Sequence, residues 1–88
     1  MQRRRYLFSG HVQGVGFRYT TREIARGYDV RGFVRNLADG KVELVLEGDG
    51  QQINQLLDEL TRKMEGFIHH TDRADAPPTG EFADFRVR

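Results

Sequence analysis

The sequence predicts an α+β sandwich, in which two helices pack on one face of a mostly antiparallel sheet of four to five strands. Three observations support this class. Apolar residues alternate in several short segments, as they do in half-buried strands, and recur at helical spacing in two longer segments. The segments follow the order strand, helix, hairpin, helix, strand, with one further strand. Two amphipathic helices need an apolar surface to cover, and an antiparallel sheet provides it.

The first strand is expected over residues 5–12, because Tyr6, Phe8 and Val12 then share one face. The arginines at positions 3–5 are expected to be a solvated start of this strand rather than a nucleic-acid-binding arm. The formal net charge of the chain is +1, so no global field attracts nucleic acid or a membrane.

The first helix is expected over residues 17–28, after a loop rich in glycine. Phe17, Ile24 and Tyr28 fall on one helical stripe, and Gly27 weakens the helix near its end. This stripe is expected to face the sheet.

A hairpin is expected to follow the first helix. Its strands are residues 29–36 and 41–47, which are rich in β-branched residues and alternate in polarity. Asp39 and Gly40 lie between them, and Asp-Gly is a strong signal for chain reversal.

The second helix has the clearest periodicity in the chain. Asp49, with Gln52 three residues later, resembles a capping box at its start, and Gly66 ends it. Its apolar stripe consists of Ile53, Leu56, Leu57, Leu60 and Met64.

Two strands remain after this helix. A short strand is expected over residues 67–71, and a closing strand over residues 82–88, with Ala83, Phe85 and Val87 on one side. Two helices that alternate with strands in this order predict the split βαβ arrangement of a ferredoxin-like sandwich.

Length and composition limit the possible functions. A chain of 88 residues has room for one domain, which we take as residues 1–88. Without cysteine there is no disulfide, no thiolate nucleophile and no thiolate metal site. No apolar stretch reaches the roughly 20 residues that span a bilayer, and the first residues are charged, so we expect a cytoplasmic protein.

The glycine-rich segment GHVQGVGFR, residues 10–18, predicts an anion-binding loop. A turn between a strand and a helix directs backbone N–H groups to one point, with the positive end of the helix dipole behind them. Arg18 adds a permanent charge whose planar donors suit phosphate oxygens. The segment fits neither the Walker A nor the dinucleotide-binding pattern, and an ordinary glycine turn is the alternative.

Covalent phosphoryl transfer through cysteine is excluded. A thiol phosphatase loop has its cysteine six positions before the arginine, and here that position is Val12. If the loop holds a reacting phosphate, water must attack it directly, and the substrate must release a good leaving group.

Two segments resemble the signatures of the acylphosphatase family. The first is GHVQGVGFR, and the second is GFVRNLADGKVELVLEG, residues 32–48; the resemblance extends over essentially the whole chain. The fixed positions of the second signature are all matched, by Gly32, Phe33, Asn36, Gly40, Val42 and Gly48.

This resemblance implies a hydrolase that cleaves acyl phosphates into a carboxylate and inorganic phosphate without a metal or cofactor. It implies that Arg18 binds the phosphate and is catalytic, and that Asn36 orients the attacking water. The implied phosphate cradle is the backbone of His11, Val12, Gln13, Gly14 and Val15. The expected partner is a small acyl phosphate, with no nucleic acid and no membrane, and the chain is expected to be a monomer.

Three alternatives stay open at this point. A metal site at His69, His70, Asp72 and Asp75 is disfavoured, because adjacent strand residues point to opposite faces. An RNA-binding module would use Arg3 to Arg5 with Tyr6 and Phe8, although the chain lacks an RNP-like pattern. The chain also resembles the accessory acylphosphatase-like modules of larger carbamoyl-transfer proteins.

Overall fold

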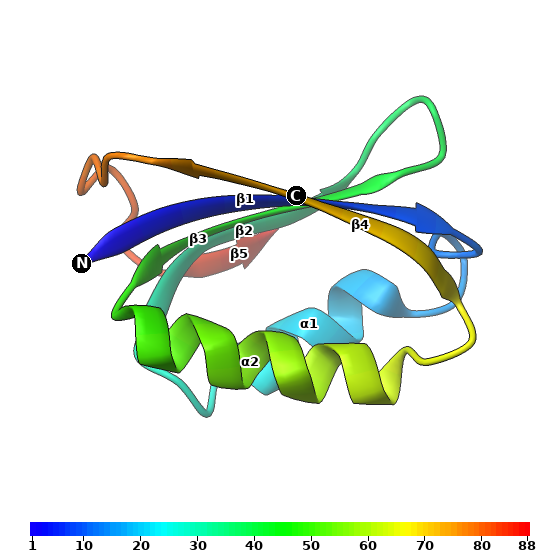
Figure 1. Cartoon of the computed structure of the whole chain (residues 1–88), viewed down its shortest axis with the longest axis horizontal. Helices are drawn as coiled ribbons and strands as arrows, with labels where there is room; N and C mark the ends of the chain where they lie inside the picture. The colour runs from blue at the N-terminus through cyan, green and yellow to red at the C-terminus, as the bar shows by residue number, and fades with distance from the viewer.

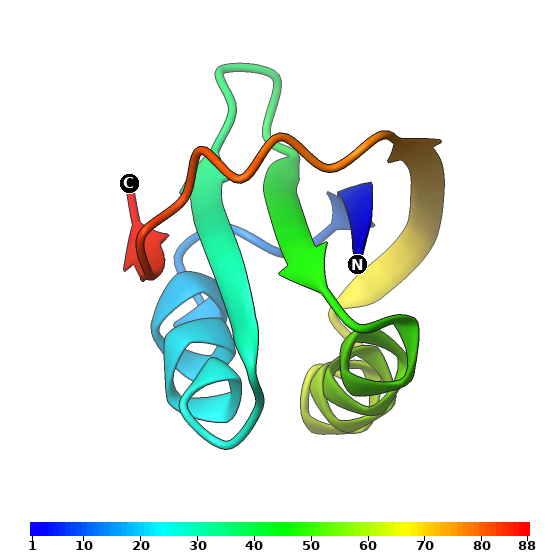
Figure 2. The ribbon, with the colours of Figure 1, turned by 90° about the vertical axis from the view of Figure 1, so that its left-hand side faces the viewer.

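Two helices cover one face of a five-stranded sheet in the computed structural model, which describes residues 1–88 (Figures 1 and 2). The strand order is β4-β1-β3-β2-β5, and every pair is antiparallel except β2 with β5. The elements are β1 (Gln2–Gly10), α1 (Phe17–Ala25), β2 (Val30–Asn36), β3 (Val42–Gly48), α2 (Gly50–Lys63), β4 (Ile68–Ala76) and β5 (Phe85–Val87). The predicted α+β, ferredoxin-like class is confirmed.

Three strands have their C-terminal ends on the same side of the molecule. Strands β1 and β2 both run antiparallel to β3, and β5 runs parallel to β2, so β1, β2 and β5 all end on this side. Figure 1 shows the loop after β1 and the turn after β2 at the same end of the molecule. Residues far apart in the sequence therefore meet there.

The first strand starts earlier and ends earlier than the predicted residues 5–12. It pairs with β3 from Gln2 onward and with β4 from Arg3, which brings the arginines into the sheet. It ends where the register with β4 shifts between Ser9 and Gly10. Gly10 has φ +128°, and a Cβ there would lie 2.5 Å from the Phe67 carbonyl oxygen, so only glycine allows this close approach.

Helix α1 is shorter than predicted and ends at Ala25 instead of Tyr28. The Gly27 amide donates to the Ile24 carbonyl at 3.0 Å, and the Tyr28 amide donates to the Ala25 carbonyl at 3.1 Å. These tight turns close the helix. Tyr28 still packs partly against the core, as its place on the predicted stripe indicated.

The hairpin of β2 and β3 agrees with the prediction to within about one residue, whereas the predicted capping box of α2 is wrong. The Asp49 carboxylate does cap α2, by accepting from the Gln51 amide at 3.2 Å. Gln52, however, accepts a hydrogen bond from the Asp29 amide at 3.1 Å. It therefore links the start of α2 to the approach to β2.

The last two strands differ most from the prediction. Strand β4 spans nine residues instead of five, because it pairs with β1 along most of that strand's length. Strand β5 contains only Phe85–Val87, because residues 77–84 cross the sheet face opposite the helices before they reach β2 (Figure 2). Ala83 and Val87 are exposed, and Phe85 alone packs against the core.

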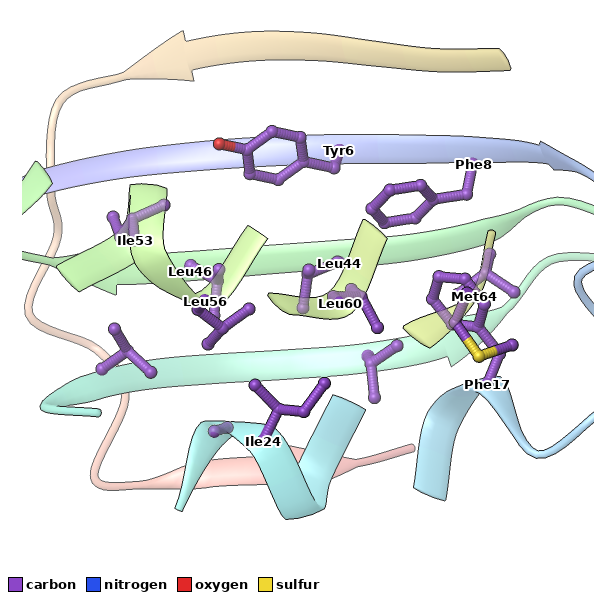
Figure 3. Close-up of a cluster of buried hydrophobic side chains, with 14 of the residues drawn as sticks. Tyr6, Phe8, Phe17, Ile24, Leu44, Leu46, Ile53, Leu56, Leu60 and Met64 are labelled. Atoms are coloured by element: carbon purple, nitrogen blue, oxygen red, sulfur yellow. The ribbon is translucent and has the colours of Figure 1, made fainter. Parts of the chain in front are cut away.

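The core lies between the sheet and both helices (Figure 3). Phe8 contacts Phe17 of α1, with ring centroids 5.0 Å apart, and connects the first strand to the start of the helix. The predicted stripe of α2 is buried except for the half-buried Leu57. Fully buried side chains include Phe8, Phe17, Leu44, Leu46, Ile53, Leu56 and Leu60.

The three N-terminal arginines are not a solvated segment. Arg4 is only 5% exposed, and its guanidinium donates to Asn54 at 2.6 Å and to Gln2 at 2.7 Å. Arg3 and Arg5 lie on the outer face of the sheet, where Arg3 pairs with Glu47 at 2.8 Å and Arg5 pairs with Glu43.

No helix has the length and hydrophobicity required to cross a membrane.

Glu47 fastens the crossing segment to the sheet. Its carboxylate is 3% exposed and accepts hydrogen bonds from Arg3, from the Thr79 amide at 2.9 Å and from the Gly80 amide at 3.0 Å. Burial acts to raise the pKa of Glu47, but these donors outweigh it and lower the pKa to about 2.

This pKa predicts a loss of stability in acid. A glutamate that titrates near pH 4.3 when unfolded and about 2 when folded contributes stability above pH 4.3, and this contribution disappears as the pH falls through 2. Glu47→Gln should lower the free energy of unfolding at pH 7 by about 2 kcal/mol and reduce its decline between roughly pH 5 and pH 2. Urea unfolding across this range measures both effects. The control Glu65→Gln changes an exposed carboxylate and should keep the wild-type slope; equal slopes in wild type and Glu47→Gln would contradict the assignment.

Candidate active site

A pocket of about 260 Å³ lies beside the C-terminal ends of β1, β2 and β5. Arg18 and Asn36, which are 18 positions apart in the sequence, both line it. The pocket has two arginines and no acidic residue in its lining, so its electrostatic potential favours an anion. The lining residues are Val12, Gly14, Gly16, Phe17, Arg18, Tyr19, Arg22, Asn36 and Val87.

The loop after β1 presents backbone N–H groups that have no partner in the chain. Gly14 and Gly16 both have φ +77°, a left-handed conformation that glycine adopts without strain. The amides from Val12 to Gly16 donate to no backbone or side-chain acceptor. A run of free backbone donors of this kind can bind an anion.

The start of α1 extends this set of donors. Gly16 is the N-cap, no side chain caps the helix, and its first turn contains no acidic residue. The first N–H groups of a helix lack intrahelical partners, and the helix dipole places partial positive charge at this end. The pocket wall from Gly16 to Tyr19 is therefore electropositive main chain as well as side chain.

The Arg18 side chain is half-buried in the second position of α1. Its Nη1 donates to the main-chain oxygen of Arg88 at 3.0 Å, so residues 87 and 88 lie beside the pocket. The remaining guanidinium donors form no other hydrogen bond. Because the guanidinium is planar, these donors suit bidentate contact with two oxygens of a phosphoryl group.

Asn36 is the last residue of β2 and is half-buried in the pocket wall. Its main chain pairs with Val42, so the strand fixes its position. Its carboxamide forms no hydrogen bond within the chain, which leaves one acceptor and two donors for a bound molecule.

Gln13 holds the glycine loop beside Asn36. Its Nε2 donates to the carbonyl of Leu37 at 2.8 Å and to that of Lys41 at 2.9 Å. Leu37 and Lys41 close the β2–β3 turn, where the Leu37 amide donates to the Lys41 carbonyl at 2.8 Å. One side-chain amide therefore connects the loop with the free donors to the turn that follows Asn36.

Only part of the expected phosphate cradle, the backbone of His11, Val12, Gln13, Gly14 and Val15, lies in the lining of the pocket. Val12 and Gly14 line the pocket, whereas His11, Gln13 and Val15 do not. The His11 amide donates to the Phe67 carbonyl at 2.8 Å, and its side chain is exposed. The unpaired amides thus begin at Val12 and continue past Val15.

Sequence reasoning missed three lining residues that matter for the shape of the pocket. Tyr19 and Arg22 belong to α1, and Val87 belongs to β5. Arg22 follows Arg18 by four positions, so helical spacing alone could have placed both on one face. Val87 could not be found in this way, because its position depends on the long crossing of residues 77–84.

The other candidate residues serve local contacts. His70 pairs with Asp72 at 3.0 Å, and Asp75 pairs with Arg73 at 2.8 Å, on the exposed strand β4. No group of three or more His, Cys, Asp or Glu side chains is placed to hold a metal ion. Tyr6 and Phe8 are buried in the core, so they cannot stack on RNA bases.

Comparison with known proteins identifies the family. Residues 4–87 match the acylphosphatase family. The chain belongs to the acylphosphatase family. The acylphosphatase of Syntrophus aciditrophicus (strain SB) is 41% identical over 88 residues, which cover 99% of this chain and 92% of that protein. The match confirms the resemblance to this family and the expectation of an acylphosphatase-type enzyme.

Solved structures agree with this assignment. The crystal structure of an acylphosphatase from Bacillus subtilis superposes with a TM-score of 0.91 at 25% identity, and covers 100% of this chain and 99% of that chain. The acylphosphatase fold also occurs inside a larger protein: T. kodakarensis HypF matches with a TM-score of 0.85 at 31% identity, over 100% of this chain but 12% of that chain.

We predict that Gln13→Ala separates the glycine loop from the β2–β3 turn. The substitution removes two hydrogen bonds to the carbonyls of Leu37 and Lys41, so the free energy of unfolding should fall by about 1–3 kcal/mol. Urea unfolding measures the change. Gln55→Ala, which removes an exposed glutamine side chain from α2, should alter stability by less than about 0.5 kcal/mol; an equally small effect of Gln13→Ala would refute the link.

Proposed function

We propose that this enzyme hydrolyses the carboxyl-phosphate bond of small acyl phosphates by direct attack of water on the phosphorus. The observation that supports this most is the shared pocket of Arg18 and Asn36, beside the unpaired amides of residues 12–16. A fixed cation, main-chain donors and a neutral carboxamide then surround one phosphoryl group.

The proposed role of Arg18 is to bind the phosphoryl oxygens and stabilise their charge in the transition state. Its half-buried guanidinium donates one hydrogen bond to the main-chain oxygen of Arg88, and its other N–H groups are free to bind the substrate. The loop amides and the start of α1 add donors that are already oriented, so little reorganisation is needed during the reaction.

The proposed role of Asn36 is to bind and orient the attacking water. Its carboxamide oxygen can accept from the water while its NH₂ donates, and β2 holds it at a fixed place in the pocket. Positioning of this kind replaces a bimolecular encounter by a prearranged one.

The reaction needs no strong acid, because an acyl phosphate releases a carboxylate, which is a weak base. No carboxylate or histidine lines the pocket to remove a proton from the water. We therefore propose that a phosphoryl oxygen of the substrate accepts this proton. The water oxygen bonds to phosphorus as the bond between phosphorus and the carboxyl oxygen breaks, which gives a carboxylate and inorganic phosphate.

Hydrolysis of benzoyl phosphate in excess EDTA tests the role of Arg18. We expect metal-independent activity in the wild type and a loss in kcat of about 10³-fold or more in Arg18→Ala, by analogy with arginine stabilisation in other phosphoryl transfers. Arg62→Ala, which removes an exposed arginine of α2 outside the pocket, should keep near-normal activity. Inhibition of the wild type by EDTA, or a folded and active Arg18→Ala, would exclude the proposal.

Asn36→Ala should lower kcat by about 10²- to 10³-fold, the range found for other positioned catalytic donors. Because the side chain of Asn36 forms no hydrogen bond within the chain, its truncation should leave the unfolding transition nearly unchanged. Steady-state kinetics and thermal unfolding of the same sample separate the two effects. A stable variant that retains near-normal turnover would remove Asn36 from the mechanism.

A further inference from the structure

We propose that Arg22 and Tyr19 form a subsite for the acyl group, and that this subsite favours acyl phosphates which carry a second anionic group, a carboxylate or a phosphate. The inference rests on the proposed function, because it assigns the part of the substrate that leaves as the carboxylate. It starts from the half of the pocket that the proposed reaction does not use.

Arg18 and Arg22 lie one helical turn apart on α1, and both line the pocket. Positions i and i+4 share one face of a helix and are separated by about 6 Å along its axis. The free loop amides lie at the start of α1, next to Arg18. With a phosphoryl group bound at that end, the acyl group extends along α1 toward Arg22.

The guanidinium of Arg22 forms no hydrogen bond within the chain. Its Nε is buried and donates no hydrogen bond. The nearest carboxylate, that of Glu23, has its Oε2 3.9 Å from this nitrogen and is engaged at 2.8 Å by Arg26. The side chain as a whole is 40% exposed and its terminal nitrogens form no hydrogen bond, so an anionic ligand group in the pocket can accept from them.

Tyr19 both orients Arg22 and provides an apolar wall. The Arg22 guanidinium carbon lies 5.2 Å from the centroid of the Tyr19 ring, a cation–π contact. Tyr19 is 60% exposed although it is a large aromatic residue, and with Val12, Phe17 and Val87 it forms the apolar lining of the pocket. These residues offer a surface for the carbon skeleton of the acyl group.

The positive potential continues beyond Arg22. A neighbouring cavity of about 330 Å³ is also lined by Arg22, together with Arg26 and Arg31. The one acidic side chain in its lining, Asp84, is paired with Arg86 at 2.9 Å. A second negative charge on the acyl group therefore meets several cations and no free carboxylate in either lining, whereas a neutral acyl group uses only the apolar wall.

Two substrates with the same ring test this subsite. The kcat/KM for 4-carboxybenzoyl phosphate is compared with that for its neutral analogue, 4-carbamoylbenzoyl phosphate, in wild type, Arg22→Gln, Arg22→Lys and Arg62→Gln. Within one variant the ratio of the two values cancels a general loss of activity, and comparison of this ratio between variants cancels the difference in intrinsic reactivity between the two substrates. Arg62 is an exposed arginine of α2 that lies outside this pocket, so Arg62→Gln controls for the loss of one positive charge.

We expect the wild type to favour the carboxylate substrate and Arg22→Gln to lower the ratio about tenfold, the effect of one partly screened charge pair. Arg22→Lys should keep most of the preference and Arg62→Gln all of it. A ratio that Arg22→Gln leaves unchanged, with both compounds hydrolysed, overturns the subsite but not the proposed function. Failure of the folded wild type to hydrolyse either compound overturns both.

Discussion

The side-chain amide of Gln13 is the contact on which the site depends. It joins the carbonyls of Leu37 and Lys41 to the loop between β1 and α1. Strands β1 and β2 both pair with β3, which holds Phe8 and Asn36 on either side of Val42, but no ladder of main-chain hydrogen bonds connects the loop after Gly10 to the β2–β3 turn. Gln13 provides that connection and thereby places the free amides of the loop next to Asn36.

Glycine makes this loop possible in two different ways. At Gly10 the neighbouring chain leaves no space for a Cβ, since the Phe67 carbonyl oxygen would be 2.5 Å away. At Gly14 and Gly16 there is open space, and the requirement is the backbone conformation itself, with φ +77° at both. The first glycine allows the loop to leave the sheet next to Phe67, and the other two allow the left-handed turns in the pocket wall. Arg18 then follows at the start of α1.

Local sequence patterns predicted most of the fold and indicated residues for a candidate site. Both helices, the hairpin and the apolar stripe of α2 follow from spacing that depends only on nearby residues. The lengths of β4 and β5 do not, because β4 is defined by its pairing with β1 and β5 by the path of residues 77–84 over the sheet. Glu47 anchors that path through Thr79 and Gly80, 32 and 33 positions away. The burial of Arg4 depends in the same way on Asn54 of α2.

The site shows the same division. Arg18 and the glycine loop are contiguous in sequence, so the sequence alone could predict that they lie together. The proximity of Asn36 required the family resemblance, and the geometry now gives it a physical basis in the common pocket. The hydrogen bond from Gln13 to Leu37 and the place of Val87 in the pocket wall have no local signal in the sequence, because each depends on a contact between distant parts of the chain.

An NMR titration with inorganic phosphate, a product of the proposed reaction, tests the central claim most directly. In the ¹⁵N-labelled protein, we predict saturable shifts that are largest for the backbone amides of residues 12–18, for the Arg18 guanidinium and for the Asn36 side-chain amide. Saturable shifts centred on another surface, with these signals unmoved, would contradict the account.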